Sequence, residues 1–165
     1  VQSRFSGAIA KWLGQSDVKA LQPCDNVPFL SFFPFSDDDT FRERFKVPVA
    51  VSVTANVVSV SIGSFIPARN ISAPAGTLSV KLILSVAGAQ LATVIPSGWQ
   101  TESIEIPFNN LEIPAKVLDF SVPTETGTLI VAAARLVYYG YKNNPLLVIE
   151  KKGFSPAEVI NAMYF

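Results

Sequence analysis

Residues 47–62 read VPVAVSVTANVVSVSI, and apolar side chains occupy every second position in two short runs. A period of two is typical of strands that bury one face. The runs, Val47–Val53 and Val58–Ile62, are separated by Ala55 and Asn56, which fit a tight turn. We therefore predict a β-hairpin in this part of the chain.

Similar strand-like runs follow along the chain. We predict further strands at residues 78–86, 90–95, 103–108, 117–122, 129–141 and 146–150. Turn-forming residues separate most of them, including Gly88-Ala89 and Pro96-Ser97-Gly98. This spacing is typical of an antiparallel sandwich or barrel. The predicted fold is a mainly β, antiparallel β-sandwich of about seven or eight strands, with a short N-terminal helix and a short C-terminal helix.

The run TLIVAAARLVYYGY at residues 128–141 fits two kinds of structure. Its three alanines favour a helix. Its even positions, however, form one continuous apolar face from Ile130 to Tyr138, with Arg135 on the opposite face. We predict a strand, half covered on its odd-numbered face.

Three zones are expected along the chain. Residues 1–46 form an N-terminal helical and aromatic arm, residues 47–151 the β-sandwich domain, and residues 152–165 a tail. In the arm, one helix is expected from Ser3 to Gly14 and a helical turn over residues 37–45 with Ser36 as its N-cap. In the tail, Ser155-Pro156-Ala157-Glu158 matches a capping box and predicts a helix that ends near Met163.

The composition excludes several classes of function. The chain has 165 residues, no net charge, 49% hydrophobic and 16% charged residues, no His and one Cys. A Ser-His-Asp or Cys-His site cannot be built, and His-bound or multi-Cys-bound metals are excluded. The dispersed, balanced charge argues against nucleic acid as a partner. No apolar run reaches the ~20 residues that a spanning helix needs, and we expect no cofactor.

Cys24 cannot form an internal disulfide, so the chain comes either from a reducing compartment or from an exported protein that uses no disulfides. The chain starts at Val1, from which we expect that an upstream segment was cleaved or omitted. An extracellular or cell-surface assembly is favoured over a cytoplasmic one, and the compartment stays open.

Aromatic residues are concentrated in the arm. Either they dock into a neighbouring subunit or they cover an edge of their own sandwich, because an exposed patch of this size promotes aggregation. We favour contact with a protein partner or a second copy. The predicted partner-contact residues are Trp12, Phe29, Phe32, Phe33, Phe35, Phe41 and Phe45.

Two further clusters have alternative interpretations. Trp99, Tyr138, Tyr139 and Tyr141 are candidates for stacking on a glycan, although aromatic packing is favoured. The run Asp37–Asp39 lacks the pattern of a calcium loop and is interpreted as the solvated start of a helix. The other acidic residues are scattered, and their spacing neither supports nor excludes a glycosidase pair.

The segment between the second and third predicted strands carries a resemblance to a known group of proteins. Its residues are Ile66-Pro67-Ala68, Ile71 and Ala73-Pro74-Ala75-Gly76-Thr77. This pattern resembles a group of uncharacterised β-sandwich proteins from Bacteroidota bacteria. The resemblance implies a sandwich and carries no activity. Pro67 and Pro74 stiffen the segment, and we expect it to fix a crossing between two sheets.

The function expected from the sequence is that of a non-enzymatic structural or protein-interaction subunit, assembling through its apolar arm and sandwich surface. The alternative is a carbohydrate-binding module that uses exposed aromatic rings. A third interpretation, a hydrolase, requires two carboxylates in one cleft.

Overall fold

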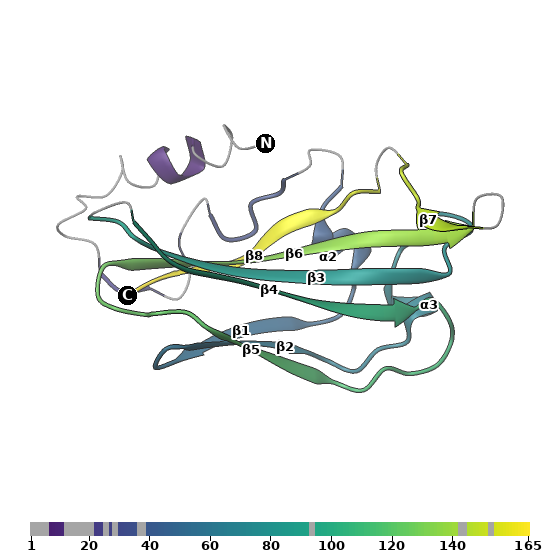
Figure 1. Ribbon diagram of the computed structural model, residues 1–165, viewed down its shortest axis with the longest axis horizontal. Helices are drawn as coiled ribbons and strands as arrows, with labels where there is room; N and C mark the ends of the chain where they lie inside the picture. Colours follow the sequence, from purple (N-terminus) through teal and green to yellow (C-terminus); the bar gives the residue numbers. More distant parts are fainter. Residues whose placement is uncertain are drawn as a thin grey trace.

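The protein is mainly β, with two antiparallel sheets and a few short helices, as the computed structural model shows in Figure 1. The structure describes residues 7–11, 22–24, 27, 30–35, 39–92, 95–141, 145–151 and 154–165.

A three-stranded sheet has the strand order β1-β2-β5. Its strands are β1 (Val49–Thr54), β2 (Val57–Ile62) and β5 (Lys116–Ser121). The first two form the predicted hairpin, in which Val49 pairs with Ile62 and Thr54 with Val57. Ala55 adopts a φ of 51° in the two-residue turn, as this kind of hairpin requires.

The larger sheet contains five strands. They are β3 (Ser79–Gln90), β4 (Ile95–Pro107), β6 (Thr128–Tyr141), β7 (Leu146–Val148) and β8 (Ala157–Tyr164). The strand order is β4-β3-β6, and both β7 and β8 pair with β6. Strand β7 pairs with residues 139–141 of β6, and β8 pairs with residues 129–135.

The two sheets lie face to face, one above the other in Figure 1, and their inward side chains form the main core. Val58, Val60 and Phe120 come from the small sheet, and the even positions of β3 and β6 come from the large sheet. From Ile130 to Tyr138, the even-numbered side chains of β6 are at most 2% exposed. The prediction of a strand over residues 129–141, rather than a helix, is therefore confirmed.

Strands β3 and β4 extend through residues where turns were predicted. Strand β3 continues past Gly88-Ala89, and β4 includes Pro96-Ser97-Gly98. Their pairing shifts register between Gly88 and Ala89, so the irregular residues form a β-bulge. A Cβ atom on Gly88 would lie 2.6 Å from the Ser97 hydroxyl, and glycine is needed for this close approach.

The helical elements differ from the prediction in their bounds. Helix α2 (Phe41–Arg44) is capped by the hydroxyl of Thr40, which accepts a hydrogen bond from the Glu43 amide, and Ser36 is not its cap. Helix α3 (Pro67–Asn70) was not predicted and lies in the segment that joins β2 of one sheet to β3 of the other. Residues 7–11 are helical, and the rest of the predicted helix from Ser3 to Gly14 lies outside the described residues.

The predicted C-terminal helix is wrong, because residues 157–164 form strand β8. Strand β6 offers an edge whose backbone groups need partners, and β8 supplies them from Leu129 to Arg135. Val159 and Ile160 are β-branched and suit a pleated strand. Pairing with the sheet outweighs the local capping signal.

The N-terminal segment, whose described residues are 22–24, 27 and 30–35, lies along the other edge of β8. Cys24 and Tyr164 exchange two backbone hydrogen bonds of 2.9 Å, and the amide of Phe32 donates to the carbonyl of Val159. Val27 and Leu30 are fully buried against Val159 and other apolar residues in a second core. This core lies on the face of the large sheet that is turned away from the small sheet (Figure 1). Residues from all three predicted zones therefore pack together.

Candidate interaction surface

The structure places two of the predicted partner-contact residues inside the molecule. Phe41 and Phe45 are 3% and 2% exposed, and their rings stack with centroids 5.2 Å apart in the main core. Rings buried in their own chain are not available to a partner, so we withdraw both from the partner-contact set. Trp12 and Phe29 lie outside the described residues.

The three remaining phenylalanines lie on the N-terminal segment. Phe33 and Phe35 meet edge to face, with ring centroids 5.7 Å apart, and pack against the second core. Phe32 is 50% exposed and has a φ of 64°, a left-handed conformation that is rare for a bulky residue. Residues 30–35 therefore cover their own sheet, and among the described residues of the predicted partner-contact set only Phe32 is largely exposed.

An ion pair between an exposed arginine and a buried glutamate joins helix α2 to strand β8. The guanidinium of Arg42 contacts the carboxylate of Glu158, which is 1% exposed, and the Arg42 amide donates to Glu158 Oε2 at 3.1 Å. Arg42 also lies 4.6 Å from the ring centroid of Phe32 and donates to the Phe32 carbonyl at 3.2 Å. Arg42 thus links helix α2, strand β8 and the N-terminal segment. Sequence patterns contain no signal for this link, because they place Glu158 in a helix cap.

Asp39 is buried as well, at 1% exposure, and forms an ion pair with Arg44. The interpretation of this residue as part of a solvated helix start is wrong, whereas Asp37 and Asp38 lie outside the described residues. The guanidinium of Arg44 also stacks 4.1 Å from the ring centroid of Phe154. The buried carboxylate is therefore compensated by a cation of its own chain. No group of three or more acidic or Cys ligands able to hold a metal ion occurs among the described residues.

Tyr138 lies beside this ion pair with its ring inside the core. Burial, and then the nearby Asp39 carboxylate, raise the pKa of the Tyr138 hydroxyl, while Arg44 opposes the shift. The hydroxyl stays protonated at neutral pH and donates to the Ser72 carbonyl at 3.1 Å. The Tyr138 hydroxyl therefore ties β6 to the segment that joins β2 to β3, and the buried ring is not exposed for stacking on a glycan.

The four candidate stacking residues do not form one platform. Trp99 and Tyr141 are 72% and 69% exposed, whereas Tyr138 is 1% exposed. Trp99 pairs with Ala87 of β3, and Tyr139 lies opposite Ser79 of the same strand. Eight residues of strand separate those two positions by roughly 27 Å. Trp99 is an isolated exposed ring at one end of the sheet.

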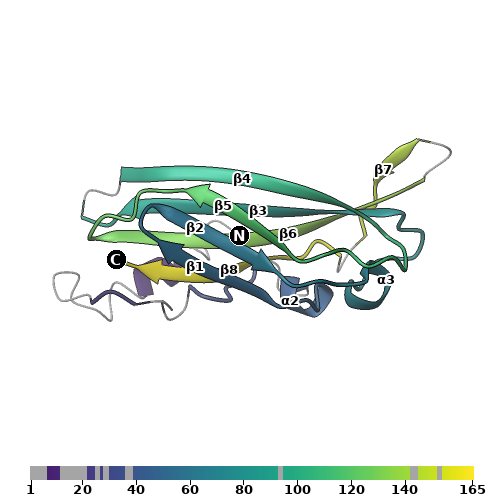
Figure 2. The same ribbon diagram turned by 90° about the horizontal axis from the view of Figure 1, so that it is seen from below.

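The other end of the large sheet carries most of the exposed apolar surface. Among the described residues, five of the ten exposed large hydrophobic side chains gather there: Leu78, Tyr141, Leu146, Leu147 and Val148. We call this group the β7 end. Figure 2 shows that β7 projects beyond the neighbouring strands. Each of the three β7 residues is 46–50% exposed, so neither face of this strand is covered.

Close packing fixes the base of the β7 end. Gly140 pairs with Leu147, and a Cβ atom on Gly140 would collide with the carbonyl oxygen of Gly76 and would lie 2.8 Å from Ile149 Cδ1. The absence of a side chain lets the loop around Gly76 rest directly on β6. Strand β7 therefore projects from a rigid base.

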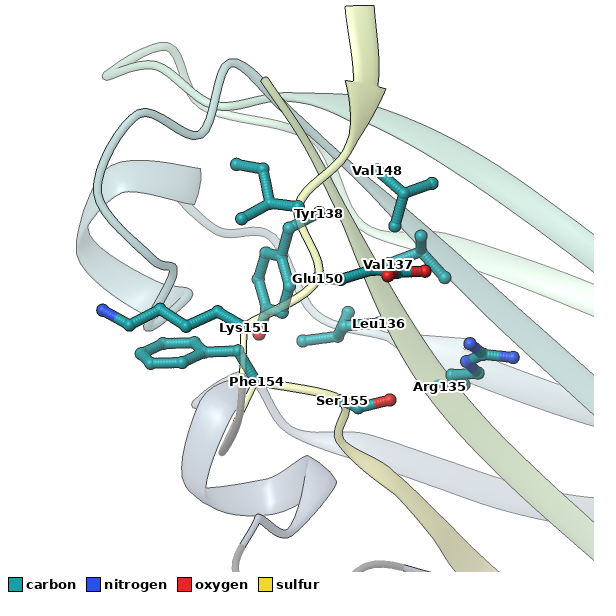
Figure 3. A pocket seen from close by; sticks show the side chains of 10 residues that line it. Arg135, Leu136, Val137, Tyr138, Val148, Glu150, Lys151, Phe154 and Ser155 are labelled. Atoms are coloured by element: carbon teal, nitrogen blue, oxygen red, sulfur yellow. The ribbon is translucent and has the colours of Figure 1, made fainter. Parts of the chain in front are cut away.

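A hollow of about 380 Å³ lies beside β7, between β6 and the chain that connects β7 to β8 (Figure 3). Its polar lining includes Arg135, Glu150 and Ser155, and Figure 3 shows the Ser155 hydroxyl directed towards the side that Arg135 occupies. Glu150 is the only carboxylate in the lining. The hollow therefore lacks the two carboxylates that a glycosidase needs.

No protein-family model matches the sequence, and no curated protein matches it. Within the part of the chain that the structure describes, none of the helices has the length and hydrophobicity needed to cross a bilayer.

Proposed function

We propose that this β-sandwich is a non-enzymatic structural or protein-interaction subunit, and that its contact surface is the β7 end rather than the aromatic arm. The observation that carries the proposal is the concentration of exposed apolar side chains around one short edge strand. Contiguous exposed apolar patches on proteins commonly mark interaction sites.

The opposite edge of the same sheet supports this choice by contrast. Strand β4 carries Pro96, Pro107, Glu102 and Glu105, and prolines and charged side chains are the usual protection of an edge against pairing. Strand β7 has the sequence LLV and carries none of them. An edge strand that lacks prolines and charges, and whose only protection is its length of three residues, is an edge to which another strand can add.

The remaining chemistry favours binding over catalysis. The chain has no His, and the two buried carboxylates among the described residues, Asp39 and Glu158, each pair with an arginine of α2. The carboxylates are therefore committed to holding the fold together. Among the described residues that line the hollow next to β7, Glu150 is the only carboxylate.

A site-specific photo-crosslinker tests the proposal. It replaces Leu147 at the β7 end, and in a control protein it replaces Val117, which is 61% exposed on β5 of the other sheet. In the cells that make the protein, we expect a protein adduct from position 147 and at least tenfold less from position 117. Equal yields, or no adduct from position 147, would contradict the proposal.

A further inference from the structure

We infer that the partner of the β7 end is a second copy of this chain, with the two β7 strands paired antiparallel and Leu147 opposite its own counterpart. This inference rests on the proposed function and names its partner. The two five-stranded sheets would then join through β7 across a two-fold axis.

The backbone of β7 presents a self-complementary edge. The Ile149 amide donates to the Tyr138 carbonyl, so these two residues form a hydrogen-bonded pair. Along an antiparallel ladder, hydrogen-bonded and non-hydrogen-bonded pairs alternate. Leu147, which pairs with Gly140, therefore turns its backbone groups towards β6. Leu146 and Val148 turn theirs outwards, where no described residue pairs with them.

These outward groups fit a second β7 in one register. With Leu147 opposite Leu147 of the other copy, Leu146 lies opposite Val148, and each of these two pairs can exchange two hydrogen bonds. The geometry is isologous, because each contact occurs twice by symmetry.

The side chains and charges allow this pairing. Every cross-strand pair in this register is aliphatic, so no like charges face each other. The chain has no net charge, so two copies do not repel one another as a whole. Tyr141 and Leu78 add apolar surface beside the strand.

The size of the surface sets the expected strength. A stable interface buries about 800 Å² on each partner, and three strand residues with two neighbours supply less than this. We therefore expect a dimer that dissociates on dilution.

A cysteine substitution tests the register. Residues opposite each other in a non-hydrogen-bonded pair have Cα atoms about 4.5 Å apart, within the range that a disulfide spans. In a Cys24→Ser background, we expect Leu147→Cys to form an intermolecular disulfide at least tenfold faster than Val117→Cys. Equal rates, or no disulfide at position 147, would overturn the inference.

Sedimentation of the unmodified chain provides the second measurement. Its mean mass is expected to rise towards twice the monomer mass with concentration. Leu147→Lys should abolish the rise, because two like charges would face each other, and Val117→Lys should not. Circular dichroism is the control that both variants are folded. A monomer at every concentration, or a dimer unaffected by Leu147→Lys, would overturn the inference.

The two proposals can fail separately. An adduct from position 147 with a different protein, together with a monomeric chain, would leave the proposed function standing and overturn the second-copy inference. Absence of any adduct from position 147 would contradict the function as well.

Discussion

Phe41 and Phe32 belong to the same aromatic region and lie in opposite surroundings. Phe41 is 3% exposed in the main core, whereas Phe32 is 50% exposed beside Arg42. Phe41→Ala should lower the free energy of unfolding by about 3–5 kcal/mol, because it leaves a cavity. Phe32→Ala should cost about 1 kcal/mol, the size of an exposed cation–π contact. Urea unfolding measures both, and similar losses would contradict the placement of these rings.

At the residue scale, composition predicts that the phenylalanines are buried but not which surface buries them. A partner and the chain's own sheet offer the same apolar surroundings, so the sequence could not separate Phe41 from Phe32. The buried acids were missed for a related reason. Glu158 finds its partner Arg42 more than a hundred positions away, and Asp39 meets Arg44 only because α2 turns the chain. Sequence patterns detect side-chain pairs three or four residues apart on a helix, and neither of these two pairs has that spacing.

At the element scale, strands with a regular period of two were the easiest to predict. The hairpin of β1 and β2 and the long strand β6 were found because alternation fixes which face is buried. Local signals for turns and helix caps gave wrong predictions where a neighbouring strand pairs with the backbone of the same residues. Gly88 and Pro96-Ser97-Gly98 look like turns but lie in paired strands, and the Ser155–Glu158 capping signal runs into the first two residues of β8. The hollow and the β7 end are formed because β7 and β8 pair with different parts of β6. A local sequence pattern does not predict this arrangement.

The packing of Gly140 gives a prediction about an element. Gly140→Ala should lower the free energy of unfolding by about 1–3 kcal/mol, because its Cβ would collide with the Gly76 carbonyl and force the loop away from β6. Gly63→Ala is the matched control, since its nearest atoms lie 3.9 Å away. Guanidinium unfolding compares the variants. Equal losses in the free energy of unfolding for the two variants would contradict the close contact between the loop around Gly76 and β6.

At the scale of the whole molecule, the N-terminal segment completes the second core. Its removal, by deleting residues 1–35, should expose the apolar face of β6 and β8 and lower the melting temperature. Val27 and Leu30 are fully buried, and each such side chain contributes about 1.5–3 kcal/mol. Calorimetry measures the loss, and binding of a hydrophobic dye reports the exposed face. Leu30→Ala is the milder comparison, and an unchanged melting temperature of the deleted chain would contradict the second core.

Strand β8 lies between β6 and the N-terminal segment, and it is made after both of them. Chains are synthesised from the N-terminus, so Val27 and Leu30 are made before Val159 and Ala162, their packing partners in β8. The second core cannot close until residues 157–164 have left the ribosome. Until then, the edge of β6 that pairs with β8 has no partner strand, and the apolar side chains of Val27 and Leu30 lack the surface that buries them.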